Sequence, residues 1–257
     1  MLEVSIIKCL SDNYSYLIRD KKSDLIGIVD PSEFEPVDRE ISKKYKRLDF
    51  ILNTHHHNDH VGGNLDLKKK YESKVICSEH DFGRIPGADI KKVDGEEFKL
   101  GNTDFKVINV PGHTLGHVLY FAKNAKVVFT GDTLFSLGCG RIFEGTFEQM
   151  LSSLEKIKSL PKNTMIYCGH EYTINNGNFC IGIDKENINL EERILEVKKK
   201  IKNNLPTIPV PISKELETNI FLRFDQQQIK NNLEMNNSSK LEIFTKLSTL
   251  NKKFLYH

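Results

Sequence analysis

The sequence lacks an excess of charge of either sign, and it lacks long hydrophobic runs. Its 37 Lys and Arg residues against 35 Asp and Glu residues give a formal net charge of +2. This balance provides no electrostatic basis for binding nucleic acid or a membrane surface, so we expect neither partner. No apolar run approaches the roughly 20 residues that a membrane-spanning helix needs.

The pattern of a secretory leader and that of a disulfide framework are also missing. The N-terminal segment is interrupted by Glu3, Lys8 and Asp12, and it lacks the basic start and long apolar stretch of a signal peptide. The five cysteines are odd in number and show no CxxC spacing, which favours neither disulfides nor a zinc ribbon. We therefore expect free thiols in a reducing compartment, namely the cytoplasm.

Short apolar segments alternate with a few helical patterns over the first two thirds of the 257 residues. Segments 50–53 and 126–130 are almost continuously apolar, which is typical of strands buried on both faces. Thr146 can cap a helix that runs to Leu160, because the apolar residues in between follow a helical spacing. This alternation of strands and helices predicts an α/β architecture with layered sheets.

The character of the sequence changes after about residue 172. Residues 173–189 are rich in Asn and Gly and predict a loop. Helical patterns follow over 190–202, 214–221 and 240–252. We therefore expect a first domain over residues 1–172 and a smaller, mainly helical domain over 173–257.

Four histidines and one aspartate occupy six consecutive positions after the apolar segment 50–53. They are His55, His56, His57, Asp59 and His60. Neighbouring imidazoles repel one another when protonated, whereas a bound cation favours neutral imidazole and ionised carboxylate. A lone histidine at a strand end is usually structural, but five ligand-type residues in one turn predict a metal site. Because His55 and His57 can face one side and Asp59 and His60 another, the spacing indicates two adjacent ions.

Three further ligand candidates, His113, Asp132 and His170, each follow an apolar strand and a glycine. Taken singly, Asp132 could cap a turn and His113 could hydrogen-bond a loop. Loops at strand ends often carry functional groups on a rigid scaffold. The recurrence of the same pattern at three strand ends therefore predicts that these residues join the cluster.

The order and spacing of these residues resemble the signature of the metallo-β-lactamase superfamily. The matching segments are His-x-His-x-Asp-His at 55–60, Gly-His-Thr at 112–114, Gly-Asp-Thr at 131–133 and Gly-His at 169–170. The resemblance covers roughly residues 1–172. It implies an αββα sandwich with metal ions at one edge of its two sheets.

The resemblance also implies two divalent ions per chain, zinc first, with iron or manganese also compatible with His and Asp ligands. The implied ligands are His55, His57 and His113 for one ion, Asp59, His60 and His170 for the other, and Asp132 between the two. His56 and His117 are not ligands in this pattern. We expect both to orient their neighbours by hydrogen bonds.

Further segments resemble the hydroxyacylglutathione hydrolase (glyoxalase II) family over nearly the whole chain. They are Asp12-Asn13-Tyr14, RIPGAD at 84–89, GCGRIFEG at 138–145 and GHEYT at 169–173. The resemblance implies a metal-dependent thioester hydrolase that converts S-D-lactoylglutathione to D-lactate and glutathione, a step of methylglyoxal detoxification. A hydroxide held between the two ions would attack the thioester, and Asp59 would orient it.

By the same resemblance, Arg141 and Tyr172 contact the glutathione part of the substrate, whose carboxylates suit a guanidinium. Phe143 stands where relatives often have Tyr, so it is expected to line the site without a hydroxyl. We expect a monomer whose partner is the small-molecule thioester.

The last helix departs from the family. The basic pair that relatives carry there aligns with Ser248 and Asn251, so Lys252 is the cation expected to substitute for it. This departure leaves the hydrolytic chemistry intact and bears on the affinity for glutathione.

Two other functions compete with thioester hydrolysis. One is a persulfide dioxygenase of the same superfamily with a single iron, against which the long helical C-terminal region and the GHEYT segment count. The other is a non-catalytic, metal-stabilised module, which would not need Arg141 and Tyr172 beside the ligands.

Overall fold

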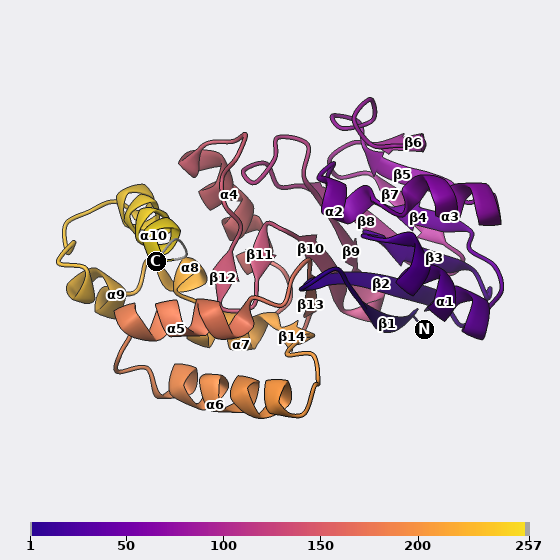
Figure 1. Cartoon of the computed structure of the whole chain (residues 1–257). Helices are drawn as coiled ribbons and strands as arrows, with labels where there is room; N and C mark the ends of the chain where they lie inside the picture. Colours follow the sequence, from indigo (N-terminus) through magenta and orange to yellow (C-terminus); the bar gives the residue numbers. More distant parts are fainter. Residues whose placement is uncertain (1, 255–257) are drawn as a thin grey trace.

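Two six-stranded sheets lie face to face at the centre of the protein (Figure 1). The computed structural model describes residues 2–254 of the chain. The first sheet has the order β1-β2-β3-β4-β5-β6. Its strands are β1 Leu2–Cys9, β2 Asn13–Asp20, β3 Ile26–Val29, β4 Phe50–Leu52, β5 Lys74–Ser78 and β6 Ala88–Lys92. Strands β1 to β3 pair antiparallel, and β3 to β6 pair parallel.

The second sheet has the order β14-β13-β10-β9-β8-β7, and only β10 and β13 pair parallel in it. Its strands are β7 Glu97–Leu100, β8 Thr103–Asn109, β9 Val118–Ala122, β10 Val127–Gly131, β13 Met165–Cys168 and β14 Val210–Pro211. A short hairpin, β11 Leu134–Phe135 with β12 Gly138–Cys139, follows β10. The inner faces of both sheets share one apolar core, to which Ile18 and Leu52 contribute from the first sheet and Phe105 and Phe129 from the second.

Helices cover the outer faces and complete the αββα layering that the family resemblance implies. The helices α1 Phe34–Lys44 and α3 Asn64–Tyr71 lie on the first sheet, where Val37, Ile41 and Leu67 form a second apolar cluster with its strands. Helix α4, Phe147–Lys158, covers the second sheet and begins at the predicted cap, since Thr146 and Gln149 form a capping box. The remaining short elements are α2 Asn58–Val61 and the 3-10 turn η1 Lys123–Ala125.

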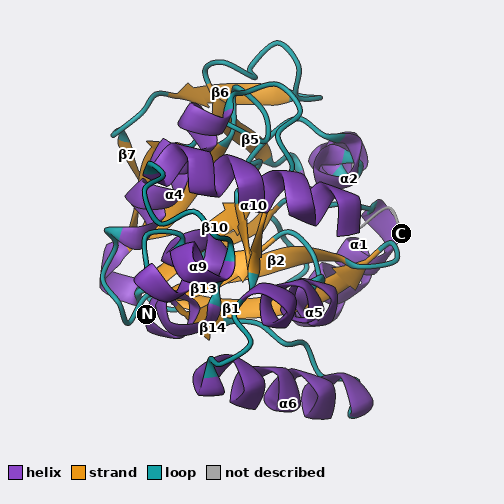
Figure 2. Cartoon of the chain, turned by 90° about the vertical axis from the view of Figure 1, so that its left-hand side faces the viewer, coloured by secondary structure: helices purple, strands orange, loops and turns teal. Residues whose placement is uncertain are grey.

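The C-terminal region is helical, and Figure 1 shows it in orange and yellow beside the sandwich. Its helices are α5 Thr173–Ile183, α6 Ile188–Lys202, α7 Ile212–Thr218, α8 Ile220–Arg223, α9 Gln227–Asn232 and α10 Lys240–Phe254. In both views α6 lies on the outer side of α5 (Figure 2), and α10 packs against α4 through the rings of Phe244 and Phe147.

Two local predictions in this region are wrong. Residues 173–183 form helix α5 and not a loop, because burial of Phe179 and Cys180 in the main core outweighs the poor helix propensity of the glycines and asparagines. The single helix predicted over 214–221 is two helices, α7 and α8. The break falls at Asn219, whose side-chain oxygen accepts a hydrogen bond from the backbone of Phe221 and caps α8.

The five cysteines are unpaired and buried. Among the described residues 2–254, none of the helices combines the length and the apolar character that crossing a membrane requires.

A buried carboxylate joins the helical region to the β11–β12 hairpin. Glu215 of α7 accepts hydrogen bonds from the Ser136 hydroxyl (2.8 Å), the Leu137 backbone (2.8 Å) and the Asn219 amide (2.9 Å). Burial raises the pKa of Glu215, while the positive charge of the buried Arg193 opposes that rise. The hairpin leads directly to the segment with Cys139 and Arg141, so this network also holds one wall of the cavity described below.

We predict that Glu215→Ala lowers the free energy of unfolding by about 3–5 kcal/mol, because it leaves three buried hydrogen-bond donors without their acceptor and removes a negative charge near the buried Arg193. Glu215→Gln keeps one acceptor oxygen and should lose less. The exposed Glu217→Ala, on the same helix, should change stability by less than about 0.5 kcal/mol. Urea denaturation measures all three, and equal losses in Glu215→Ala and Glu217→Ala would contradict the prediction.

Candidate metal centre

The loops that follow β4, β8, β10 and β13 bring the seven predicted ligands to one edge of the sandwich. Their ligand atoms form three overlapping groups, each within 4.8 Å: His55, His57 and His113; His55, His60 and Asp132; and Asp59, His60 and His170. The grouping differs from the implied one, since His55 and His60 each belong to two groups and Asp132 belongs only to the group that contains them both. The assignment of each ligand to one of two ions stays a prediction.

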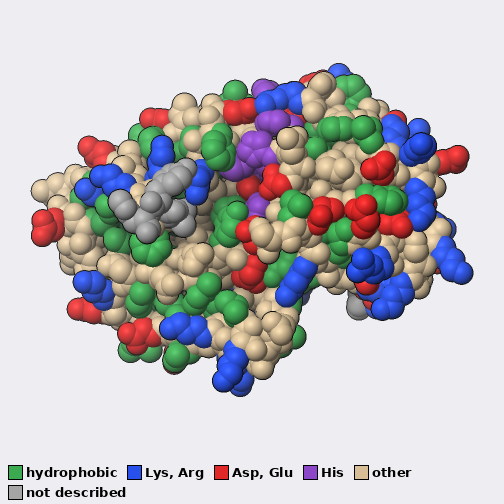
Figure 3. Space-filling view, viewed as in Figure 1, with side chains coloured by type: hydrophobic (Ala, Val, Ile, Leu, Met, Phe, Trp, Pro, Cys, Tyr) green, Lys and Arg blue, Asp and Glu red, His purple; other side chains and the backbone are tan. Residues whose placement is uncertain are grey.

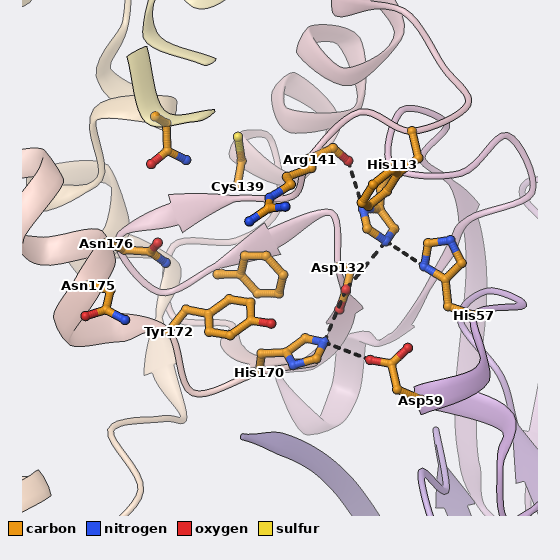
Figure 4. A pocket seen from close by; sticks show the side chains of 13 residues that line it. His57, Asp59, His113, Asp132, Cys139, Arg141, His170, Tyr172, Asn175 and Asn176 are labelled. Atoms are coloured by element: carbon orange, nitrogen blue, oxygen red, sulfur yellow. Dashed lines mark hydrogen bonds and ion pairs between the residues drawn. The ribbon is translucent and has the colours of Figure 1, made fainter. Parts of the chain in front are cut away.

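Asp132 lies between the groups (Figure 4). One carboxylate oxygen is 3.3 Å from His60 Nε2, and the other is 3.5 Å from His113 Nε2 and 3.3 Å from His170 Nε2. Asp59 Oδ2 lies 3.3 Å from the same nitrogen of His170. A carboxylate placed among imidazoles of two groups is suited to bridging two cations.

The glycines of the Gly-Asp and Gly-His segments are required by these close approaches. Gly131 adopts a φ of +46°, and a Cβ there would lie 2.5 Å from the Thr54 hydroxyl. A Cβ at Gly169 would lie 2.2 Å from Asp132 Oδ1 and 2.8 Å from His60 Cε1. Gly169 therefore makes room for two ligands, and Gly131 makes room for the hydroxyl that orients His55.

Four of the five ligand histidines are oriented through their Nδ1 atoms. The partners are the Thr54 hydroxyl for His55 (3.0 Å), Asp30 for His60 (3.1 Å), the Arg141 carbonyl for His113 (2.8 Å) and Asp12 for His170 (2.7 Å). This leaves Nε2 of each ring toward the centre. His57 is the exception, because its Nδ1 faces Nε2 of His55 at 3.1 Å and Nε2 of His113 at 3.0 Å.

The donor set fits divalent metal ions. His60 Nε2 and Asp132 Oδ1 are buried and have no hydrogen-bond partner within the described chain. Burial, together with the nearby His113 and His56, lowers the pKa of His57 to about 4, and burial likewise lowers the pKa of His55. Although burial acts in the opposite direction, Asp132 and Asp59 raise the pKa of His170 to about 10. Ionised carboxylates around buried imidazoles thus place negative charge where a cation would bind.

The two remaining histidines of the motifs lie outside these groups. His117 is buried, accepts a hydrogen bond from the Asp132 backbone at Nε2 (3.0 Å) and stacks on His55. His56 turns away toward Asp81 (3.2 Å). Asp30 was missed from the sequence, although it follows an apolar strand in the same way as the ligands do.

A cavity of about 440 Å³ opens over the ligands, and Figure 3 shows the histidines gathered in a hollow between the sandwich and the helical region. Arg141, Phe143 and Tyr172 line it, as do Asn175 and Asn176 of α5, which the sequence does not suggest because their Asn- and Gly-rich segment predicts a loop. The Tyr172 ring stacks on His170 with centroids 4.7 Å apart. Phe143 is 63% exposed, and its ring edge packs against His57 and His113.

A second cavity of about 340 Å³ adjoins the first and shares Cys139, Arg141, Phe143 and Asn251 with it. Lys252 and Ser248 of α10 line this second cavity. Asn251 is only 8% exposed, and its side-chain oxygen has no partner within the described residues. All four predicted substrate residues thus border one continuous cleft that begins at the metal ligands.

Comparison with known proteins shows which family has this architecture. Residues 11–170 match the family model of the metallo-beta-lactamase superfamily, and residues 171–254 match that of the hydroxyacylglutathione hydrolase C-terminus. The chain is 54% identical over 222 residues to the hydroxyacylglutathione hydrolase of Pelagibacter ubique (strain HTCC1062), covering 86% of this chain and 93% of that protein. The chain belongs to the hydroxyacylglutathione hydrolase family of the metallo-β-lactamase superfamily.

A second member of the hydroxyacylglutathione hydrolase family, from Methylococcus capsulatus (strain ATCC 33009 / NCIMB 11132 / Bath), is 42% identical over 96% of both chains. Among solved structures, ETHE1 from Myxococcus xanthus superposes with a TM-score of 0.66 at 23% identity over 98% of both chains. The BLEG-1 B3 metallo-beta-lactamase superposes with a TM-score of 0.65 at 21% identity, covering 86% of this chain and 99% of its own. These two structures show the shared fold alone. The division of the chain at 172/173 stays a prediction.

We predict that Gly169→Ala lowers metal affinity, because its Cβ would displace Asp132 and His60. From the general cost of disturbing groups that orient metal ligands, we expect roughly a 10–100-fold loss. Gly182→Ala is the matched control, since a Cβ there has no atom within 4 Å in the described structure. Competition with a chromophoric chelator measures the affinity, and equal affinities of the two variants would contradict the prediction.

Proposed function

We propose that the protein hydrolyses S-D-lactoylglutathione to D-lactate and glutathione as a metal-dependent thioester hydrolase. The carrying observation is the convergence of seven ligand side chains beneath a cleft, in a chain 42–54% identical to hydroxyacylglutathione hydrolases. These relatives do not favour the persulfide dioxygenase or the non-catalytic module.

Two divalent ions per chain, zinc first and iron or manganese as alternatives, form part of the proposal. The three ligand groups overlap at His55 and His60, and the Asp132 carboxylate lies 3.3–3.5 Å from imidazoles of two groups, which supports two ions side by side. When bound, such ions polarise a carbonyl oxygen and lower the pKa of water toward about 7.

Asp59 is the proposed residue that orients the attacking water. Its side chain is 39% exposed toward the cleft, and Asn13 donates a hydrogen bond to its Oδ2 (2.9 Å). Although burial acts in the opposite direction, His170 and His60 lower the pKa of Asp59, so its carboxylate stays ionised and accepts a hydrogen bond. The leaving thiolate is a weak base and needs no strong general acid.

A thiol nucleophile is not part of this mechanism. Cys139 borders the cleft, but burial raises its pKa well above that of a free thiol. A thiol held in its protonated form attacks carbonyl groups poorly.

The glutathione part of the substrate is proposed to extend from the ligands into the second cavity. Arg141 and Lys252 are positioned there to attract its carboxylates, and Phe143 and Tyr172 provide apolar walls. The two cavities share four lining residues, so an extended tripeptide can reach from the ligands into the second cavity.

The cytoplasmic location and the monomeric state are likewise proposed. Five buried, unpaired cysteines support a reducing compartment.

We predict that the purified protein cleaves S-D-lactoylglutathione with release of free thiol. Asp132→Ala and His57→Ala should lower kcat/KM by roughly three orders of magnitude or more, because each removes a ligand of the proposed ions. His80→Ala is the matched histidine control, since His80 is half-exposed and lies outside the ligand groups. Thioester cleavage, metal content and circular dichroism are measured on the same samples.

Full activity of Asp132→Ala would refute the assigned roles. Oxygen consumption with glutathione persulfide in the absence of thioester cleavage would refute the proposed reaction.

A further inference from the structure

The segment Asp12-Asn13-Tyr14 marks the family in the sequence, yet none of its residues belongs to a ligand group or lines either cavity. Asp12 ends the turn between β1 and β2, and Asn13 and Tyr14 begin β2, in the first sheet. Its backbone pairs with the loop after β13, in the second sheet: Tyr14 N–H donates to the Gly169 carbonyl (2.8 Å), and Glu171 N–H donates to the Asp12 carbonyl (2.9 Å). Asn13 and His170 face each other in this antiparallel bridge.

The side chains of the turn reach two metal ligands directly. Asp12 Oδ1 lies 2.7 Å from Nδ1 of His170. The Asn13 amide donates both to Asp59 Oδ2 (2.9 Å) and to the Asp59 carbonyl (3.1 Å). One turn thus holds a ligand from the loop after β13 and a ligand from α2, which are 111 positions apart in the sequence.

Both ligands belong to the same group, Asp59–His60–His170. The outer contacts of the His55–His57–His113 group come from elsewhere, from the Thr54 hydroxyl and the Arg141 carbonyl. The turn therefore supports one of the two proposed ion sites and leaves the other to different elements.

We propose that Asp12 and Asn13 are positioning residues of the Asp59–His60–His170 site and set its affinity for metal separately from that of the His55–His57–His113 site. This inference rests on the two-ion centre of the proposed function. Asp12 fixes the tautomer and ring orientation of His170, so that Nε2 faces the centre. The uncharged amide of Asn13 donates a hydrogen bond to the carboxylate of Asp59. An aspartate at position 13 would instead place a second negative charge beside that carboxylate and repel it.

The Asp12 side chain adds little to global stability, because it is 35% exposed and ion pairs at such positions contribute little to folding. Loss of metal from one site is therefore separable from loss of the fold in the Asp12 variants. Asn13 is 4% exposed, so circular dichroism accompanies the titration of its variant.

The test is a Zn²⁺ titration of the full-length protein against a chromophoric chelator, with bound zinc counted by elemental analysis and no substrate present. Asp12→Ala and Asn13→Ala should each lose affinity for one of two zinc ions by roughly 10–100-fold, with the other ion bound as in the parent protein. Asp12→Asn keeps an acceptor oxygen and should lose less. Asp104→Ala, on β8 with a side chain 43% exposed and remote from the ligands, is the control.

Retention of both zinc affinities in Asp12→Ala and Asn13→Ala would overturn the inference, and so would parallel loss of both ions, since that would show general support and not a selective site. A single zinc ion bound alike by parent and variants would also overturn it. If Asp12→Ala does not fold, the isosteric Asp12→Asn decides. Failure of the parent protein to cleave the thioester would refute the proposed reaction and leave this titration readable.

Discussion

Asp132 is the residue on which the geometry of the centre depends. It lies buried at the end of β10, and its carboxylate faces imidazoles from three different loops. Burying a carboxylate costs free energy unless positive charge lies nearby. Closely spaced imidazoles repel one another when protonated, unless negative charge lies among them. Placing the Asp132 carboxylate among the imidazoles lowers both costs, and the same arrangement of donor atoms is suited to holding divalent ions.

The rest of the sandwich supplies the rigidity that this concentration requires. Gly169 stands where two ligands approach each other, and four histidine rings are held at their outer nitrogens by Asp12, Asp30, Thr54 and a backbone carbonyl. Because the strands that carry these loops belong to two sheets packed over a common core, a change in their packing reaches several ligands together.

The helical region provides the other half of the site. It closes one side of the cleft with α5 and α10, and Glu215 ties it to the hairpin that leads to Arg141. A second connection passes through Glu171, which accepts hydrogen bonds from Tyr14 and from both the backbone and the hydroxyl of Thr207. The sandwich thus carries the proposed metal ligands, and the helical region borders the cleft proposed to hold the glutathione part.

The local pattern of the chain was sufficient for an α/β architecture and for the seven ligand candidates, and the resemblance of short segments with fixed spacing implied the αββα class and the family. The His55 to His60 turn, the glycine before each later ligand and the Thr146 cap are of this kind. Helix α5 was misread, since its asparagines and glycines have poor intrinsic propensity and only burial of Phe179 against the core makes the segment helical. Tertiary structure alone decided which ligands Asp12, Asn13 and Asp30 contact. It also decided that the side-chain oxygen of Asn251 lies without a partner among the described residues, beside the second cavity. Hydrogen bonds and cavities join residues far apart in the chain, and their distances are set only when both sheets and the helices have packed.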